Sequence, residues 1–416
     1  GLFQAPSDLP DDNLVTVQAT STGDPSKFGS VSFFLTTGPN VTFSKPPADV
    51  TSVINLQGPP LGLKMASSKG KIYLTWVATN LYNITHLWYS VGDKSGSFSS
   101  PHDVLDDVKT IIQTLGTPNP ENPVIATDGN NIFIAWDDNI TTNFQVYLVK
   151  GVVGSSITFA PFAKTSNSNN PSLQAETSST VLQQRPSMVS SPEGNVDLSW
   201  EVANGSEYVI HYIELDKNGY KLRSTDIPAT ATPNYQRFSS VATDLNGNIS
   251  ITWRDDNAQA TTPNIYYSNW PVGQGGFTSP PQQVETALFT QSDSYAMALN
   301  TTGVPFITWS ITSSQNQTTN LFTASNTGSS FTVPAFRENG FTPTLKIDFL
   351  NYADLSWWDG SQSVYFMKGT LGFTVTSSYQ TSGANPVMDI DEGGRVNLLY
   401  TKSSGQNIST WFVRGE

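Results

Sequence analysis

Apolar and polar residues alternate in a short phrase that recurs along the whole chain. In one copy, "TDLNGNISITW", a turn rich in Asp, Asn and Gly precedes Ile249, Ile251 and Trp253 on one face of a strand, with hydroxyl residues on the other face. This period of two predicts a β-strand that is entered through a tight turn. The phrase occurs seven times, and its copies end at Trp76, Trp136, Trp200, Trp253, Trp309, Trp357 and Tyr400.

Two further strand-like segments follow each copy of the phrase. The first of them is rich in aromatic and β-branched residues, as in "NIYYSNW" and "EYVIHYIEL". The second carries Phe, then Thr or Ser, then Pro two residues later, as at residues 98–101, 277–280 and 331–334. Four antiparallel strands per repeat, at a spacing of roughly 43 to 64 residues and without helical periodicity, are typical of propeller blades.

We therefore predict an all-β fold: a single seven-bladed β-propeller of four-stranded antiparallel blades, with eight blades as the alternative. The strands of a blade are named A to D from the axis outward. The last repeat lacks strand D, and we expect residues 41–45 to supply it beside residues 408–413, which closes the ring and removes a free sheet edge. A surplus strand at 31–35 could pair within the chain, begin an eighth blade or pair with another molecule.

The predicted division of the chain follows from this closure. Residues 1–40 form an N-terminal arm with one extra strand, and residues 41–416 form the propeller. Its blades are placed near 58–105, 122–164, 185–228, 237–286, 294–337, 342–380 and 384–416 plus 41–50.

The segment "IATDGNNIFIAWDDN", followed by "FQVYLVKG" and "ITFAP", resembles the sialidase-like (BNR or Asp-box-like) propeller repeats of secreted archaeal proteins. The resemblance covers roughly residues 41–416 and implies the propeller fold. The full Asp-box, S-x-D-x-G-x-T-W, is intact in none of the copies. The resemblance is therefore specific for the fold and weak for function.

Composition narrows the functional classes. The net charge of −13 and the pI of about 4.6 disfavour nucleic acid as a partner. The absence of cysteine excludes disulfides, thiolate metal sites and a cysteine nucleophile. No apolar run is long enough for a membrane span. The chain starts at Gly1 without a leader, as a processed exported protein or a trimmed chain would, and we expect an extracellular or cell-surface location.

Two groups of residues can be interpreted as sugar-binding elements. The tryptophans occupy one equivalent position in buried strands, so inter-blade packing is the favoured interpretation over sugar stacking. Arg185 and Arg237 precede strand A, and Arg254 follows strand B on the same face. The sialidase resemblance implies that arginines on this face clamp the carboxylate of an acidic sugar, while the alternative is that they neutralise nearby acids. No F-R-I-P phrase is present, and no nucleophilic tyrosine can be selected among the 15.

Acidic residues follow strand B in several repeats and predict an acidic rim of B–C turns. The rim is a candidate Ca²⁺ site, although Asp is also an ordinary turn residue, and no other cofactor is expected. Its members are Asp137, Asp138, Glu201, Asp255, Asp256 and Asp359. The histidines, His86, His102 and His211, are scattered and lack the spacing of a zinc site.

N-glycosylation sequons provide the last candidate sites, and all of them fall in inferred turns, where a glycan is tolerated. The candidates are Asn40, Asn83, Asn139, Asn204, Asn248, Asn300, Asn316 and Asn407.

The favoured function is a non-enzymatic extracellular propeller, a structural component of an envelope or surface assembly that binds other proteins or glycans. No catalytic residue is assigned, and the N-terminal strand is a candidate for self-assembly. Two alternatives remain: a sialidase-like carbohydrate-active enzyme that uses the arginine clamp, and a metal-dependent polysaccharide-binding protein that uses the acidic rim.

Overall fold

The structure is a computed structural model. It describes residues 14–416 apart from gaps at 21, 25, 35–39, 44, 55–59, 81, 141–142, 165–170, 177–180, 192, 230–234, 257–263, 286–293, 313–318, 327–329, 333–334, 372–373 and 405–406.

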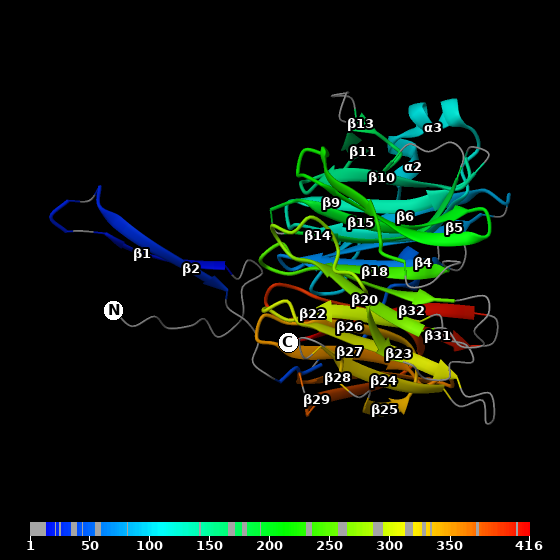
Figure 1. The fold of residues 1–416 in the computed structure, drawn as a ribbon. Helices are drawn as coiled ribbons and strands as arrows, with labels where there is room; N and C mark the ends of the chain where they lie inside the picture. Colours follow the sequence, from blue (N-terminus) through cyan, green and yellow to red (C-terminus); the bar gives the residue numbers. More distant parts are fainter. Residues whose placement is uncertain are drawn as a thin grey trace.

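Seven four-stranded antiparallel sheets form the blades of a propeller (Figure 1). Blade 1 contains β4 (Leu61–Ser68), β5 (Lys71–Thr79), β6 (Thr85–Asp93) and β7 (His102–Asp103), and blade 2 contains β8 (Pro120–Thr127), β9 (Asn131–Asp138), β10 (Gln145–Val152) and β11 (Phe159–Pro161). Blade 3 contains β14 (Leu182–Ser190), β15 (Val196–Asn204), β16 (Glu207–Leu215) and β17 (Lys221–Asp226), and blade 4 contains β18 (Gln236–Thr243), β19 (Ile249–Asp255), β20 (Asn264–Trp270) and β21 (Gln282–Glu285).

The remaining blades complete the ring. Blade 5 contains β22 (Tyr295–Leu299), β23 (Pro305–Thr312), β24 (Thr319–Ser325) and β25 (Ala335–Asn339), and blade 6 contains β26 (Phe341–Ile347), β27 (Tyr352–Trp358), β28 (Ser363–Thr370) and β29 (Val375–Ser382). Blade 7 contains β30 (Ala384–Ile390), β31 (Val396–Ser404), β32 (Asn407–Gly415) and β3 (Ala48–Asp49). Neighbouring inner strands contact one another, including β30 and β4, so the ring is closed. The seven-bladed prediction is confirmed, and the eight-bladed alternative is wrong.

The N-terminal segment closes blade 7, as predicted, but the strand that pairs with β32 is residues 48–49 and not the predicted 41–45. Strand β3 pairs with β32, and the Val50 N–H donates to the Thr410 carbonyl at 2.9 Å. Within 41–45, Thr42 exchanges backbone hydrogen bonds with Glu416, at 2.9 and 3.2 Å. The sequence "KPP" at 45–47 separates these two contacts, because proline lacks the N–H that a continuous strand requires.

The N-terminal arm contains a hairpin, where the sequence predicted a single strand at 31–35. Strand β1 (Leu14–Thr20) pairs with β2 (Phe28–Phe34), and together they project away from the propeller (Figure 1). Strand β1 was not predicted because its sequence lacks the recurring phrase of the blades, although its apolar and polar residues alternate.

Short helices are a second feature that sequence patterning missed. α1 (Thr51–Ile54) follows β3, while α2 (Val104–Asp107) and α3 (Lys109–Leu115) follow β7. The two helices α2 and α3 contribute to the core between blades 1 and 2, where Val104, Leu105 and Ile112 are buried. Strands β12 (Ala163–Lys164) and β13 (Pro171–Ser172) form a small separate pair.

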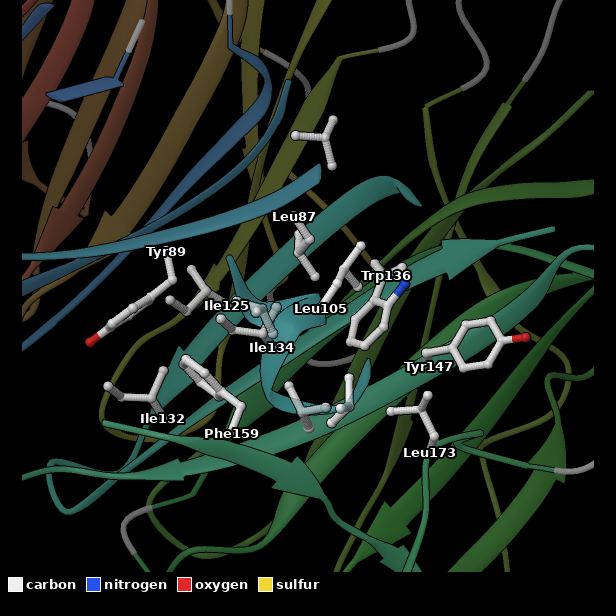
Figure 2. Close-up of a cluster of buried hydrophobic side chains, with 14 of the residues drawn as sticks. Leu87, Tyr89, Leu105, Ile125, Ile132, Ile134, Trp136, Tyr147, Phe159 and Leu173 are labelled. Carbon is white, nitrogen blue, oxygen red and sulfur yellow. The ribbon is translucent and has the colours of Figure 1, made fainter. Parts of the chain in front are cut away.

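The recurring tryptophans pack between blades, as the sequence analysis favoured. Trp136 of blade 2 shares a hydrophobic cluster with Leu87 and Tyr89 of blade 1 (Figure 2). Trp200 likewise packs with Phe133 of blade 2. The same relation, in which the aromatic residue packs on the preceding blade, holds for Trp76, Trp253, Trp309, Trp357 and Tyr400. Burial of these large aromatic rings stabilises each blade junction.

Candidate functional site

A β-bulge near the start of strand A distorts the inner strand in six blades. At each bulge the pairing with strand B shifts, and one residue adopts a positive φ angle between 46° and 61°. Such bulges re-aim side chains and are frequent beside functional sites. The residues with positive φ are Gly62, Asn122, Arg185, Phe238, Thr342 and Asn385.

The bulges of blades 3 and 4 help to bring three arginines together. The guanidinium carbons of Arg185, Arg237 and Arg254 lie 4.9, 5.4 and 4.4 Å from the centroid of the Phe238 ring. Arg237 also lies 4.2 Å from the centroid of the Tyr208 ring. Cations at these distances are attracted by the aromatic faces. We name these five side chains the arginine cluster.

A buried carboxylate holds the arginine cluster in place. Glu201 is fully buried, and its Oε2 accepts hydrogen bonds from Arg185 at 2.8 Å and from Arg237 at 2.7 Å. Its Oε1 accepts the Phe238 N–H at 2.7 Å, so the carboxylate of blade 3 also fixes the bulge of blade 4. Arg254 pairs with both carboxylate oxygens of Asp256. Glu201 therefore orients two arginines and leaves other N–H groups of their five-donor guanidiniums for a ligand.

The predicted acidic rim is not a rim of B–C turns. Asp137, Asp138, Glu201 and Asp255 lie within strand B and are buried, because the strand extends beyond the tryptophan. Asp137 accepts hydrogen bonds from Asn122 and from the Arg185 N–H, as Glu201 does at the next junction.

Only two of the predicted acids lie outside the strands. Asp256 follows β19 and pairs with Arg254, while Asp359 accepts three backbone N–H groups of its own B–C turn. Among the described residues, no three His, Cys, Asp or Glu side chains are grouped to hold a metal ion.

Asp138 gives a prediction of its own. Burial raises the pKa of Asp138 to about 7, although Oδ1 accepts the Asn119 N–H at 2.8 Å. Because the pKa in the folded protein lies above the ordinary value of 3.8, ionisation destabilises the fold, and this penalty grows between about pH 4 and pH 7. We expect Asp138→Asn, which keeps the shape and the acceptor, to raise the free energy of unfolding at pH 8 by about 1–4 kcal/mol.

Urea unfolding of both proteins at pH 8 and pH 4 checks this prediction. At pH 4 the wild-type carboxyl is largely protonated in the fold, so the two stabilities should nearly coincide. A stability difference that is the same at both pH values would contradict the ionisation argument.

The arginine cluster is accessible from solvent, but not fully exposed. The side chains of Arg185, Arg237 and Arg254 are 34%, 20% and 13% exposed. Tyr295, on the inner strand of blade 5, adds a phenol beside the cluster, where its pKa responds to Arg254, Glu201 and Asp256. Burial raises the pKa of Tyr295 well above the ordinary value. Sequence reasoning missed Tyr295 because nothing in its own repeat marks it; only the ring places blade 5 beside blade 4.

The histidines do not gather, as expected from their spacing, but each one has a carboxylate partner. His86 lies 2.6 Å from Asp103, and His102 lies 2.9 Å from Asp107. His211 lies between two carboxylates, at 2.7 Å from Glu176 and 2.6 Å from Asp226.

The His211 group ties the segment before blade 3 to the outer part of that blade. Although burial disfavours the charged imidazole, hydrogen bonds to Asp226 and Glu176 raise the pKa of His211 to about 9. The hydrogen bond from His211 lowers the pKa of Glu176 to about 2. The group is therefore ionised near neutral pH and is a structural ion pair.

The structure places the candidate glycosylation sites in different environments. Asn40, Asn83 and Asn139 are exposed. The amide of Asn248 is engaged on both sides, donating to Asp244 at 2.8 Å and accepting the Val272 N–H at 2.8 Å. Asn300 accepts two backbone N–H groups of its own turn. Asn204 and Asn407 end or begin strands, and Asn316 lies outside the described residues. Occupancy of all these sites stays a prediction.

Comparisons with known proteins agree with the fold. No family model and no curated protein sequence matches the chain. Among solved structures, the polysaccharide lyase Uly1 has a TM-score of 0.54 at 12% identity, covering 85% of this chain and 90% of its own. A PL25 ulvan lyase bound to -[GlcA(1-4)Rha3S]- has a TM-score of 0.54 at 9% identity, covering 88% and 96%. Trypanosoma rangeli sialidase has a TM-score of 0.48 at 9% identity, covering 85% of this chain and 54% of its own.

These comparisons contradict the expectation of a non-enzymatic protein. The two lyases share the propeller over most of both chains, and both are enzymes. In the described part of the chain, no helix is long and apolar enough to cross a membrane. At such low identity the likeness carries the fold alone, so any activity must be argued from the side chains of this protein.

Proposed function

We propose that the protein is a carbohydrate-active enzyme that holds an acidic sugar at the arginine cluster. The observation that carries the proposal is the convergence of Arg185, Arg237 and Arg254 on the Phe238 ring, in a chain whose net charge is −13. The overall field of such a chain repels anions, so a carboxylate is attracted where guanidinium groups outnumber acids. The polysaccharide lyases that share the fold support a carbohydrate substrate.

The charge balance of the cluster favours one additional anion. Arg185 and Arg237 share the single carboxylate of Glu201, which leaves one positive charge in excess among these three groups. Guanidinium groups bind carboxylates bidentately with strong, charge-assisted hydrogen bonds. A sugar carboxylate would pair with the donors of Arg185 and Arg237 that Glu201 does not use, while the sugar ring would lie near Tyr208.

Cleavage also requires a group that transfers a proton. The raised pKa keeps the Tyr295 phenol protonated at neutral pH, so Tyr295 is the proposed proton donor beside Arg254. Its hydroxyl lies 3.4 Å from the Thr252 carbonyl, which fixes its position in the absence of substrate. This assignment applies equally to hydrolysis and to β-elimination, since both reactions protonate a leaving group.

The test is an activity assay with two acidic substrates. A fluorogenic sialoside reports hydrolysis, and the ultraviolet absorbance of unsaturated products from a uronate polysaccharide reports elimination. We expect turnover in one of the two assays. Arg237→Lys keeps the charge but loses the forked geometry, and its kcat/KM should fall about 10- to 100-fold, as expected for a charged hydrogen bond of about 1.5–3 kcal/mol.

Arg223→Lys is the matched control for this variant. Arg223 is also ion-paired, to Glu214 at 3.0 Å, and its guanidinium carbon also lies over an aromatic ring, 4.9 Å from the centroid of Trp270. Unlike Arg237, it lies in β17, the outermost strand of blade 3. The control should keep wild-type activity. Tyr295→Phe should lose turnover while it retains binding of the acidic oligosaccharide in affinity electrophoresis. No turnover and no binding with either substrate would refute the proposed function.

A further inference from the structure

The axis of the propeller contains a cavity of about 600 Å³, and Tyr295, the proposed proton donor, is among the residues that line it. Small side chains of the inner strands of blades 4 and 5, Ala242, Ala296 and Ala298, are among its lining residues. A cavity of this volume lies within the range that small-molecule sites occupy.

Two lysines from different blades line this cavity. Lys346 of blade 6 pairs with Asp389 of blade 7, with 2.6 Å between Nζ and Oδ1. The other oxygen of Asp389 accepts the N–H and the hydroxyl of Ser67, at 2.6 and 2.8 Å. Both carboxylate oxygens of Asp389 therefore have partners. Within the part of the chain that the structure describes, Lys64 of blade 1 has neither an ion pair nor a hydrogen bond.

The surroundings of Lys64 are unfavourable for an isolated cation. Its side chain is exposed to the open space of the cavity. Burial, and secondly the positive charge of Lys346, lower the pKa of Lys64. An anion that binds beside Lys64 and Lys346 relieves the repulsion between the two ammonium groups.

Hydroxyl groups lie at the same level of the ring as Lys64. Ser187, Ser240 and Thr344 each pair with the residue before the tryptophan of strand B, as Lys64 does, and all three line the cavity. Ser187 Oγ accepts the Val241 N–H at 3.1 Å, so its own hydrogen remains to be donated. A ring of hydroxyl donors around ammonium groups favours an oxyanion.

The acids at the far end of the cavity do not neutralise Lys64, because other groups hold them. Asp348 accepts a hydrogen bond from Lys368 at 2.5 Å, and Asp391 accepts one from Arg395 at 2.7 Å. Asp244 accepts from the side chain of Asn248, and Glu392 accepts from Ser68 and the Lys69 N–H. Neutral donors hold Asp244 and Glu392, and among the described residues no ion pair joins either of these acids to Lys64.

We propose that the central cavity binds a small anion, a carboxylate or phosphate no larger than a sugar acid, whose oxygens pair with Lys64 and accept hydrogen bonds from Ser187, Ser240 and Thr344. Lys346 provides the second positive charge. The site requires no catalysis, so it stands or falls separately from the enzymatic function proposed above.

Isothermal titration calorimetry with D-glucuronate, inorganic phosphate and neutral D-glucose tests this site. In the Arg237→Lys variant, in which the arginine cluster is weakened, we expect one anion per chain to bind and glucose to give no heat. The affinity should fall at least ten-fold in Lys64→Met. It should persist in Lys109→Met, which removes an exposed lysine of α3, and in Arg237→Lys, which changes the arginine cluster. Glucuronate and phosphate distinguish an organic acid from an inorganic ion.

If either anion binds the wild type but not Lys64→Met, the proposal is supported. If binding is lost only in Arg237→Lys, the heat comes from the arginine cluster and the proposal is overturned. Absence of binding to the wild type, or equal binding to Lys64→Met, also overturns it. Thermal unfolding without added anion checks that the variant folds. Lys64→Met should melt at or above the wild-type temperature, since it removes an unpaired charge; a markedly lower melting temperature would show that Lys64 has a partner within the chain.

Discussion

Deletion of residues 1–50 is expected to open blade 7 while the opposite side of the ring stays folded. The deletion removes β3, the Thr42 pairing with Glu416, and two buried side chains, Val41 and Val50. Burial of two valines contributes about 3–6 kcal/mol. The backbone groups of β32 that lose their partners form a free edge, and such an edge pairs with other chains. We therefore expect a protein that self-associates and is several kcal/mol less stable.

Hydrogen exchange along the chain is the decisive measurement. Residues 384–416 should lose at least ten-fold in protection. Blade 4 should keep its protection, because the closing strand belongs to blade 7, which is not a neighbour of blade 4 in the ring. The matched control is deletion of residues 1–40, which removes the hairpin of β1 and β2 but keeps the closing contacts. A monomeric 1–50 deletion with unchanged protection in blade 7 would show that the closing segment is dispensable.

Replacement of Trp253 by alanine is expected to lower the free energy of unfolding by about 3–5 kcal/mol. The side chain is fully buried, stacks on Tyr266 with 6.0 Å between ring centroids, and packs with Ile210 and Tyr212 of the preceding blade. Its loss leaves a cavity at a blade junction that a closed ring cannot collapse, since both blades are held by their other neighbours.

Urea unfolding with a two-state analysis measures this change. Tyr82→Ala is the control, because Tyr82 is a large aromatic residue that is 84% exposed, and its loss should change stability by less than about 0.5 kcal/mol. A Trp253→Ala protein within about 1 kcal/mol of the wild type would contradict the idea that the recurring tryptophans hold the blades together.

The sequence was sufficient for the blades because their cause is local. The alternation before Trp253 and the turn residues Asp244 and Gly247 lie within a few residues of one another, and this pattern of turn and strand occurs seven times in the chain. Asp244 indeed accepts the N–H groups of Asn246 and Asn248 inside this turn. The helices α2 and α3 escaped because each is too short to show a helical period.

The arginines could be assigned to one face from strand order, since strand A begins where strand B ends. Their convergence on Phe238 could not be predicted, because it depends on bulges at Arg185 and Phe238 that interrupt the pairing with strand B. The acids after the tryptophan were misplaced for a related reason. Strand B continues past Trp136 and Trp200, so Asp137 and Glu201 are buried and bind the bulge of the next blade instead of facing solvent.

By itself, the sequence determined the number of blades, the order of their strands and the packing of the tryptophans, because period-two patterning and turn chemistry are properties of adjacent residues. Only the tertiary structure decided which charges meet. Lys346 pairs with Asp389, Lys64 has no ion pair among the residues that the structure describes, and Tyr295 of blade 5 lies beside Arg254 of blade 4. The two pairs lie 43 positions (346 to 389) and 41 positions (254 to 295) apart in the sequence, and the packing of neighbouring blades brings them together. Electrostatic energy depends on such distances and on burial, neither of which is written in the order of residues along one strand.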